Sequence, residues 1–240
     1  MNFLSVVIPA YNEGARIIPT IQAVAYHCVR QPYRWEIVVV NDGSRDDTAA
    51  HIERLARTIP QMRVLHHVRN RGKGAAIRTG LLEARGEAVL FCDADGATPI
   101  EELSKLLVSL GSGAAMSVGS RRVPGAQVVF KQPGLRRFMS NFYPRICRIL
   151  LRLGVADVTC GFKLLSQEAA RVIAPRMRIA RWSFDAEIFV IAGIHGFQVT
   201  EIPVRWTDQR KSKVRLLKDA WGSFRELFQI RSNARKGLYR

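Results

Sequence analysis

Two aspartates one residue apart, Asp93 and Asp95, follow an apolar run at residues 88–92. The run is too short for a typical helix and is typical of a central strand in a parallel sheet, so both carboxylates should lie just past its carboxyl end. Ligands of open α/β sheets bind at that edge. Two acids so close repel each other unless a cation joins them, and hard oxygen ligands suit Mg²⁺ or Mn²⁺ carrying a substrate's phosphates. The pair predicts a divalent-metal site, although a solvated Asp-x-Asp turn is the alternative for the tripeptide alone.

Polar side chains also follow the first two expected strands. The first strand ends in Pro9-Ala10-Tyr11-Asn12-Glu13, where a dinucleotide-binding turn would need glycines. Side chains must therefore bind any ligand there, and Tyr11 is available to stack on a base. Asp42, at the tip of the second strand, can accept hydrogen bonds from a ribose or a base. Each acid alone could simply cap a helix, but acids at three strand ends favour a nucleotide site.

Lys73 lies in an Arg-Gly-Lys-Gly sequence, residues 71–74, that opens a predicted helix. The backbone N–H groups at a helix start attract anions, and the lysine would add a positive charge there. Ordinary turn chemistry is the alternative. The five histidines have no metal-ligand spacing, so we interpret them as surface or packing residues.

Strands and helices alternate through the first half of the chain. Short apolar runs predict strands at residues 3–9, 35–40, 63–68, 87–92, 114–118 and 199–206. Helical patterns lie between the first four strands, which is the signature of a doubly wound, mostly parallel α/β sheet with helices on both faces. Residues 122–134 and the stretch around 159–161 are predicted as loops. Helices are predicted at about 135–153, 166–174, 184–194 and from 214, with a frayed basic tail. We divide the chain into a nucleotide-binding half (1–120), an acceptor-side half of the same domain (121–206) and a basic amphipathic helix with its tail (207–240).

The charge is concentrated in the second half of the chain. The 240 residues carry a formal net charge of +17. Residues 121–152 contain eight Lys or Arg and no acid, and residues 205–240 contain eleven against three acids. Such a distribution implies an anionic partner: nucleic acid, anionic lipid or a phosphorylated substrate. Because the basic segments carry apolar faces, they suit a membrane interface better than nucleic acid.

Further sequence features bear on the compartment. The four cysteines are scattered without a CxxC, which fits a reducing cytosol and argues against a structural zinc site. Met1 leads directly into the first strand, so we expect no signal peptide. No apolar run has the length of a membrane-spanning helix. We therefore expect a cytoplasmic protein, peripheral at the cytoplasmic face of a membrane.

The motifs in order resemble those of a known enzyme family. Ser-Val-Val-Ile-Pro-Ala-Tyr-Asn-Glu, Val-Asn-Asp-Gly-Ser, Asn-Arg-Gly-Lys-Gly and Asp-Ala-Asp-Gly resemble family-2 glycosyltransferases of the GT-A fold. The later segments 157–163 (Asp-Val-Thr-Cys-Gly-Phe-Lys) and 181–187 (Arg-Trp-Ser-Phe-Asp-Ala-Glu) resemble a narrower group, the dolichyl-phosphate β-glucosyltransferases and other polyprenyl-phosphate glycosyltransferases. The resemblance covers about residues 4–230.

The resemblance implies roles for particular residues. The nucleotide's base and ribose would be held by Pro9, Tyr11, Asn12, Glu13, Asp42 and Asp93, with Lys73 at the phosphates. Asp93 and Asp95 would be the metal ligands and, with Arg121 and Asp157, the catalytic residues. The acceptor phosphate would be bound by Ser120, Arg121, Arg136, Arg137 and Lys163. Asp185 and Glu187 are candidates for contacts to the acceptor or the sugar, and structural hydrogen bonding is as good an account of them and of Asp157. Ala97 stands where mannose enzymes often have a glutamine ligand, as in the glucosyl group.

The expected reaction is an inverting, metal-dependent transfer of glucose from UDP-glucose to a polyprenyl phosphate. The metal and nearby cations would offset the charge of the leaving diphosphate. A lipid phosphate is already mostly ionised near neutral pH, so it needs orientation by arginines more than a base. GDP-mannose, another UDP-sugar and another acceptor stay open as alternatives. A basic nucleic-acid-binding protein is the alternative of another class, and it would have no need of Asp93 or Asp95.

Overall fold

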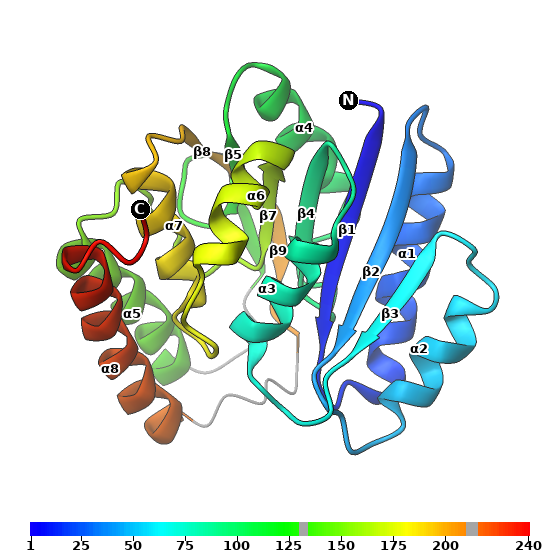
Figure 1. Ribbon diagram of the computed structural model, residues 1–240, viewed down its shortest axis with the longest axis horizontal. Helices are drawn as coiled ribbons and strands as arrows, with labels where there is room; N and C mark the ends of the chain where they lie inside the picture. The colour runs from blue at the N-terminus through cyan, green and yellow to red at the C-terminus, as the bar shows by residue number, and fades with distance from the viewer. Residues whose placement is uncertain (130–133, 210–215) are drawn as a thin grey trace.

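The computed structural model describes residues 1–129, 134–209 and 216–240, with side chains described in 1–129, 142–209 and 222–240. One seven-stranded sheet forms the centre of the molecule, with strand order β3-β2-β1-β4-β7-β5-β8 (Figure 1). Its strands are β1 (Phe3–Ala10), β2 (Arg34–Asn41), β3 (Met62–His66), β4 (Ala88–Cys92), β5 (Met116–Ser120), β7 (Phe162–Ser166) and β8 (Val199–Pro203). All neighbouring strands are parallel except β7, which runs antiparallel to β4 and β5. The predicted α/β class, with a mostly parallel sheet, is confirmed.

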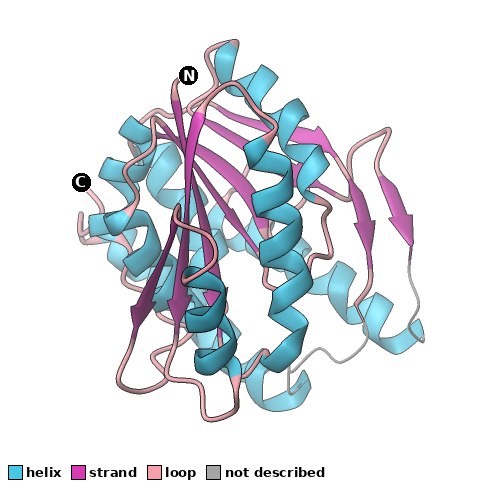
Figure 2. Cartoon of the chain, turned by 90° about the vertical axis from the view of Figure 1, so that its right-hand side faces the viewer, coloured by secondary structure: helices cyan, strands magenta, loops and turns pink. Residues whose placement is uncertain are grey.

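Helices cover both faces of the sheet (Figures 1 and 2). The described helices are α1 (Ile17–Val29), α2 (Thr48–Ala56), α3 (Lys73–Glu83), α4 (Leu103–Gly111), α5 (Gly134–Leu151), α6 (Gln167–Arg176), α7 (Phe184–Ile194) and α8 (Leu216–Arg235). Helices α1, α2 and α4 pack on one face, and α3, α6 and α7 pack on the other, with α5 and α8 outside α7. No helix in the described part of the chain is long and apolar enough to cross a membrane.

The strand sequences explain the two cores. Side chains alternate between the faces of a sheet, so a strand covered on both faces must be apolar at nearly every position. In β2, Ile37 and Val39 pack under α1 and α2, whereas Val38 and Val40 pack against α3. All four are fully buried. This arrangement holds the carboxyl ends of β1, β2 and β4 rigidly side by side.

Three segments differ from the sequence prediction. The prediction of a loop passing directly into a helix near residue 166 was wrong, because β7 follows that loop and lies in the middle of the sheet. The single strand predicted at 199–206 is two strands, β8 and β9 (Arg205–Thr207). The predicted loop 122–134 contains a short strand, β6 (Gln127–Val129), which pairs with β9 in a separate small sheet. The tail is packed rather than frayed: Tyr239 is fully buried. Its carbonyl oxygen lies 2.7 Å from Nε2 of His195, the residue that follows α7.

Candidate active site

A cavity of about 520 Å³ lies at the carboxyl ends of β1, β2 and β4. Its walls come from seven stretches of the chain that the sheet brings together. They are lined by Pro9, Ala10, Tyr11, Glu13, Arg16, Asp42, Asn70, Gly72, Lys73, Ala76, Asp93, Ala94, Asp95, Arg121, Thr159, Arg181 and Trp182. The volume is in the range of small-ligand sites. Of the predicted nucleotide residues, all but Asn12 line this cavity.

The two acids that follow β4 both face the cavity. A Cβ on Gly161 would lie 2.2 Å from Oδ2 of Asp93, so the carboxylate of Asp93 fits only because residue 161 is glycine. The backbone N–H of Asp93 donates to the carbonyl oxygen of Gly161 (3.1 Å). Oδ1 of Asp95 accepts the N–H of Ala97 (3.0 Å). Burial and then the charge of Asp93 raise the pKa of Asp95, so this pair of acids favours a bound cation.

Lys73 supplies a cation at this point. Its Nζ forms an ion pair with Oδ1 of Asp93 at 2.6 Å and lies 5.7 Å from the centre of the Phe184 ring. Burial acts to lower the pKa of Lys73, but the charges of Asp93 and Asp185 outweigh it and raise that pKa. Because Lys73 is the first residue of α3, the ammonium and the N–H groups of the helix start present positive charge to the same part of the cavity.

Asp42 lies in the cavity wall, but its carboxylate is hydrogen-bonded to other groups of the protein. Oδ1 lies 2.6 Å from Nδ1 of His67 and accepts the N–H of Arg71 (2.9 Å). Oδ2 accepts the N–H of Gly72 (2.8 Å) and a bond from Nδ2 of Asn70 (2.8 Å). The side chain therefore fixes the loop before α3, and its direct contact with a nucleotide stays a prediction.

The residues after β1 divide into two groups. Pro9, Tyr11 and Glu13 line the cavity, and Nε of Arg16 donates to the carboxylate of Glu13 at 2.7 Å. Asn12 instead joins the loops after β1 and β2. Its N–H donates to Oγ of Ser44 (2.9 Å), and its Oδ1 accepts the N–H of Arg45 (2.7 Å). Asn12 therefore positions the loop and does not line the cavity.

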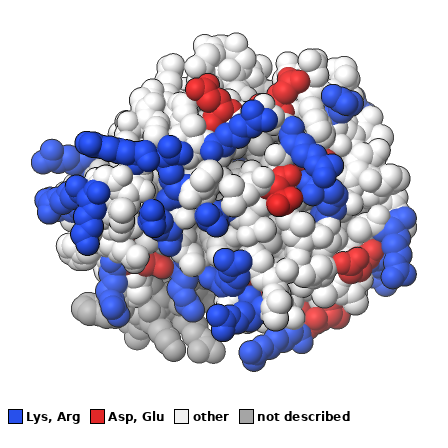
Figure 3. Space-filling view, viewed as in Figure 1, with Lys and Arg blue, Asp and Glu red and all other residues white. Residues whose placement is uncertain are grey.

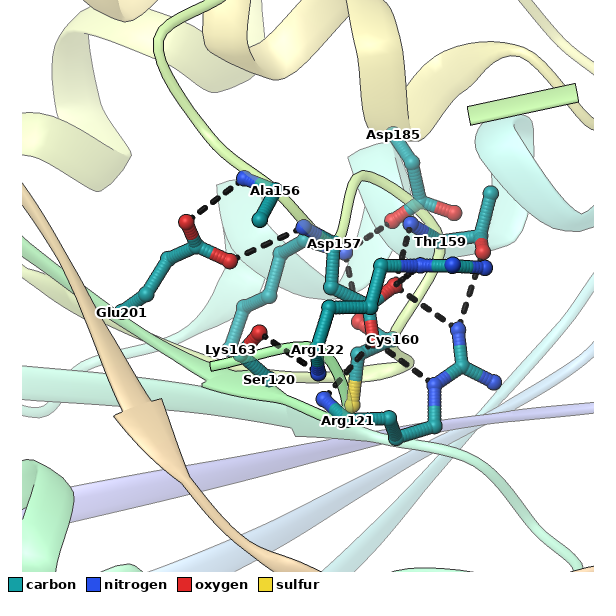
Figure 4. Close-up of polar contacts among 10 residues, drawn as sticks. All are labelled: Ser120, Arg121, Arg122, Ala156, Asp157, Thr159, Cys160, Lys163, Asp185 and Glu201. Carbon is teal, nitrogen blue, oxygen red and sulfur yellow. Dashed lines mark hydrogen bonds and ion pairs between the residues drawn. The ribbon is translucent and has the colours of Figure 1, made fainter. Parts of the chain in front are cut away.

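Arg121, whose side chain is 18% exposed, and the fully buried Asp157 form an ion pair in the wall of the cavity (Figure 4). Nε and Nη2 of Arg121 donate to the two carboxylate oxygens of Asp157 at 2.7 and 2.8 Å. Nη2 of Arg121 also reaches Oγ1 of Thr159 (2.9 Å). Burial acts to raise the pKa of Asp157, but the hydrogen bonds and charge of Arg121 lower it to about 2. Glu201 accepts the N–H groups of Ala156 (2.6 Å) and Asp157 (2.9 Å) and so holds the loop in place.

Asp157 is fully buried and does not line the cavity, whereas the guanidinium of Arg121 does. A charged, rigidly oriented arginine at a cavity wall is a good partner for a phosphate. Asp157 therefore holds the guanidinium of Arg121 in place, and its predicted part in catalysis stays a prediction.

Two predicted acceptor residues, Ser120 and Lys163, lie away from the cavity. Both are fully buried. Nζ of Lys163 donates to the carbonyl oxygen of Cys160 (2.6 Å) and forms a close ion pair with Asp185. It also lies 5.3 Å from the centre of the Phe91 ring. The structure thus shows Lys163 bonded within the protein, and its contact with a lipid phosphate stays a prediction. The other two predicted acceptor residues, Arg136 and Arg137, lie in α5, outside the residues whose side chains the structure describes.

Some cavity residues were absent from the predicted site. Arg16, Asn70, Thr159, Arg181 and Trp182 all line it. Arg181 and Trp182 are the first two residues of the 181–187 motif. That motif carried the family resemblance, but no contact with a ligand was predicted for these two residues. No sequence signal separated Arg16 from an ordinary helix arginine.

The residues present fit a divalent metal held partly by its substrate. Among the described residues no group of three or more His, Cys, Asp or Glu side chains could hold an ion. Mg²⁺ and Mn²⁺ sites for nucleotide substrates need only one or two carboxylates, because the phosphates and water supply the remaining ligands. Asp93 and Asp95 supply two carboxylates beside an anion-attracting helix start.

Comparisons with known proteins agree with this geometry. A model described as "Glycosyl transferase family 2" matches residues 5–173. A dolichyl-phosphate beta-glucosyltransferase of Trichomonas vaginalis is 40% identical over 225 residues, which are 89% of this chain and 66% of that protein. A dolichyl-phosphate beta-glucosyltransferase of Saccharomyces cerevisiae is 33% identical, covering 99% of this chain and 77% of that protein. The chain thus spans about two thirds to three quarters of the length of these relatives.

A solved structure has the same fold. The glucosyl-3-phosphoglycerate synthase of Mycobacterium tuberculosis, in complex with Mn²⁺, UDP-glucose and phosphoglyceric acid, matches with a TM-score of 0.69. The match covers 98% of this chain and 80% of that one, at 20% sequence identity.

Proposed function

The chain belongs to glycosyl transferase family 2, and on that premise we propose that it transfers glucose from UDP-glucose to a dolichyl-type polyprenyl phosphate. The observation that carries the proposal is that Asp93 and Asp95 line the same cavity as Lys73, Arg121 and Arg181. Lys73 and Arg181 lie by the start of α3, and Arg121 comes from the separate loop after β5. Two such groups of positive charge beside paired carboxylates suit two phosphorylated substrates. The named relatives support glucose and dolichyl phosphate as the particular substrates.

The residues of the cavity account for each part of this reaction. Tyr11 and Glu13 bind the nucleoside, and Lys73 with the start of α3 binds the diphosphate. Asp93 and Asp95 would hold Mg²⁺ or Mn²⁺, which supplies charge to offset the leaving group. Arg121 orients the lipid phosphate, already mostly ionised because its second pKa is about 6.

A phosphate oxygen of the acceptor then attacks C1 of the glucose. The bond from C1 to the diphosphate oxygen breaks, and UDP leaves with the electron pair, so the configuration at C1 is inverted. No proton has to be removed from the attacking oxygen, and the reaction therefore needs no protein base.

We also propose that the protein is peripheral at the cytoplasmic face of a membrane. Described Lys and Arg side chains lie on the left of Figure 3, the side on which Figure 1 places α5 and α8. On α5 and α8 the apolar side chains of Phe142, Ile149 and Phe228 are 50%, 81% and 61% exposed. Apolar side chains among basic ones suit the boundary of an anionic bilayer, where each basic residue contributes about 1 kcal/mol.

The donor is tested by thermal stability and by transfer. We expect UDP with Mn²⁺ to raise the melting temperature more than GDP with Mn²⁺, because a ligand that binds only the native state stabilises it by mass action. UDP-glucose and dolichyl phosphate should then give a glucosylated lipid. Glu83→Gln, an exposed change on α3, is the control and should behave as wild type. A larger shift with GDP, and transfer from GDP-mannose instead, would replace this proposal with the mannosyl reaction.

A further inference from the structure

One wall of the cavity is the loop between α6 and α7, residues 177–183, called here the cavity loop. Arg181 and Trp182 in this loop line the cavity, and Trp182 is 37% exposed. The loop lies directly on the start of α3. A Cβ on Gly72 would come within 2.3 Å of the carbonyl oxygen of Ala180, and the N–H of Gly74 donates to the carbonyl oxygen of Arg181 (3.3 Å). The position of this loop therefore sets the shape of the cavity beside Lys73.

A buried carboxylate on α7 holds the first part of the cavity loop. The side chain of Glu187 is fully buried, and its two oxygens accept the N–H groups of Arg178 and Ile179, both at 2.9 Å. A third bond comes from the end of the sequence, where the hydroxyl of Tyr239 donates to Oε1 of Glu187 at 2.7 Å. Tyr239 is also fully buried, and Nδ2 of Asn233 donates to its hydroxyl (3.1 Å). Burial raises the pKa of Glu187, so it depends on these donors to stay ionised.

Helix α8 holds the last residue of the same loop. The N–H of Ser183 donates to Oε2 of Glu226 (3.0 Å), and its hydroxyl donates to the carbonyl oxygen of Ser223 (3.1 Å). The hydroxyl of Tyr143 on α5 donates to Oγ of Ser183 (2.9 Å). The cavity loop is thus bonded at both ends to groups that belong to, or are held by, the segment 216–240. This segment lies wholly outside the residues 5–173 that the family model matches.

We propose that the segment 216–240 positions the cavity loop, and that Tyr239 and Glu226 set the affinity of the cavity for the nucleotide sugar. The inference rests on the proposed function for the identity of the ligand. The buried apolar side chains Leu227 and Ile230 account for the packing of α8 on the core. In addition, Tyr239 bonds to Glu187, which holds the first part of the cavity loop, and Glu226 bonds to the last residue of that loop. The same loop lines the ligand cavity. Tyr239 and Glu226 are positioning residues, because neither lines the cavity.

The test compares Tyr239→Phe and Glu226→Ala with wild type well below the melting temperature. Each change removes one hydrogen bond to the loop or to Glu187, and a net hydrogen bond is worth about 1 kcal/mol, so the KM for UDP-glucose should rise about fivefold. The kcat should change less than twofold, since no reacting atom is touched. Hydrogen–deuterium exchange should speed up at Arg178 and Ile179 in Tyr239→Phe and at Ser183 in Glu226→Ala.

Two controls separate positioning from loss of stability. Leu238→Ala alters an exposed neighbour of Tyr239. Ser5→Ala removes a buried hydroxyl that donates to Glu36 (2.7 Å) near the start of β1, at the opposite end of the strand from the cavity. Ser5→Ala should lower the melting temperature while leaving the KM and the exchange of the cavity loop unchanged.

An unchanged KM and unchanged exchange of the loop in both Tyr239→Phe and Glu226→Ala would overturn the inference. So would an equal rise in KM in Ser5→Ala, because the effect would then follow stability alone. Failure of the proposed function looks different. If wild type neither binds UDP nor transfers glucose, but the loop still exchanges faster in the two variants, the positioning of the loop stands and its ligand is another one.

Discussion

Replacing Asp157 by asparagine tests the pair that holds Arg121 in the cavity wall. The pKa of Asp157 falls from its ordinary 3.8 to about 2, a shift worth about 2 kcal/mol of stability. Because this pKa is lowered by folding, the stabilisation is complete above about pH 4 and is lost as the pH falls through about 2. In Asp157→Asn the guanidinium of Arg121, whose side chain is 18% exposed, loses its counter-charge. Breaking a fully buried pair typically costs about 3–5 kcal/mol, and the partial exposure of Arg121 favours the lower figure.

Urea unfolding followed by circular dichroism measures this cost. At pH 7 we expect the free energy of unfolding of Asp157→Asn to be lower than that of wild type by about 3 kcal/mol. The difference should shrink as the pH approaches 2, since protonated aspartate then resembles asparagine. Glu83→Gln, which is exposed, should change it by less than about 0.5 kcal/mol. A loss under 1 kcal/mol in Asp157→Asn, or a difference independent of pH, would refute the assignment of the low pKa to this ion pair.

A double variant separates stability from catalysis. Arg121→Met combined with Asp157→Asn removes both charges of the pair and keeps a side-chain oxygen that can accept the backbone N–H of residue 121, so no buried charge is left unpaired. We expect near wild-type stability and retained UDP binding, together with at least a hundredfold loss of transfer to the lipid phosphate. Retained transfer would show that Arg121 does not orient the acceptor.

Three further predictions concern the metal and the membrane. Asp95→Asn should fold with an unchanged far-ultraviolet spectrum but lose the Mn²⁺-dependent part of UDP binding in calorimetry; near wild-type turnover would contradict the metal assignment. Gly161→Ala should push the carboxylate of Asp93 aside and weaken Mn²⁺-dependent UDP binding at least tenfold, which the same titration measures; equal affinity would mean that the loop yields at no cost. Arg136→Ala with Arg137→Ala should slow transfer to lipid phosphate and weaken flotation with anionic vesicles while sparing UDP binding, and equal flotation of wild type with neutral and anionic vesicles would remove this helix from the membrane contact.

The sequence predicted the sheet where the pattern was local. Apolar runs at β1, β2 and β4 alternate with helical patterns, so their parallel direction followed from short-range features. Strand β7 was missed because Lys163 interrupts its apolar run. Only its distant partners show that this lysine is neutralised by Asp185 and lies over aromatic rings.

The site was predictable to the same extent. Acids at the strand ends identified the cavity edge, because all parallel strands end on one side. Bonds between separate loops were not predictable, since they depend on three-dimensional approach. Asp42 binds the loop before α3, and Tyr239, predicted to lie in a frayed tail, is buried against Glu187. No local property of the last five residues distinguishes a packed tail from a mobile one.

The place of β7 in the sheet has a consequence for folding during synthesis. Strand β4 pairs on one side with β1, but its other edge is covered by residues 162–166, about seventy positions later in the chain. Until those residues leave the ribosome, the apolar strand Ala88–Cys92 has an open edge that another chain can join. The same docking brings Gly161 against Asp93. The nascent chain therefore completes the surroundings of Asp93 and closes the open edge of β4 in one late event.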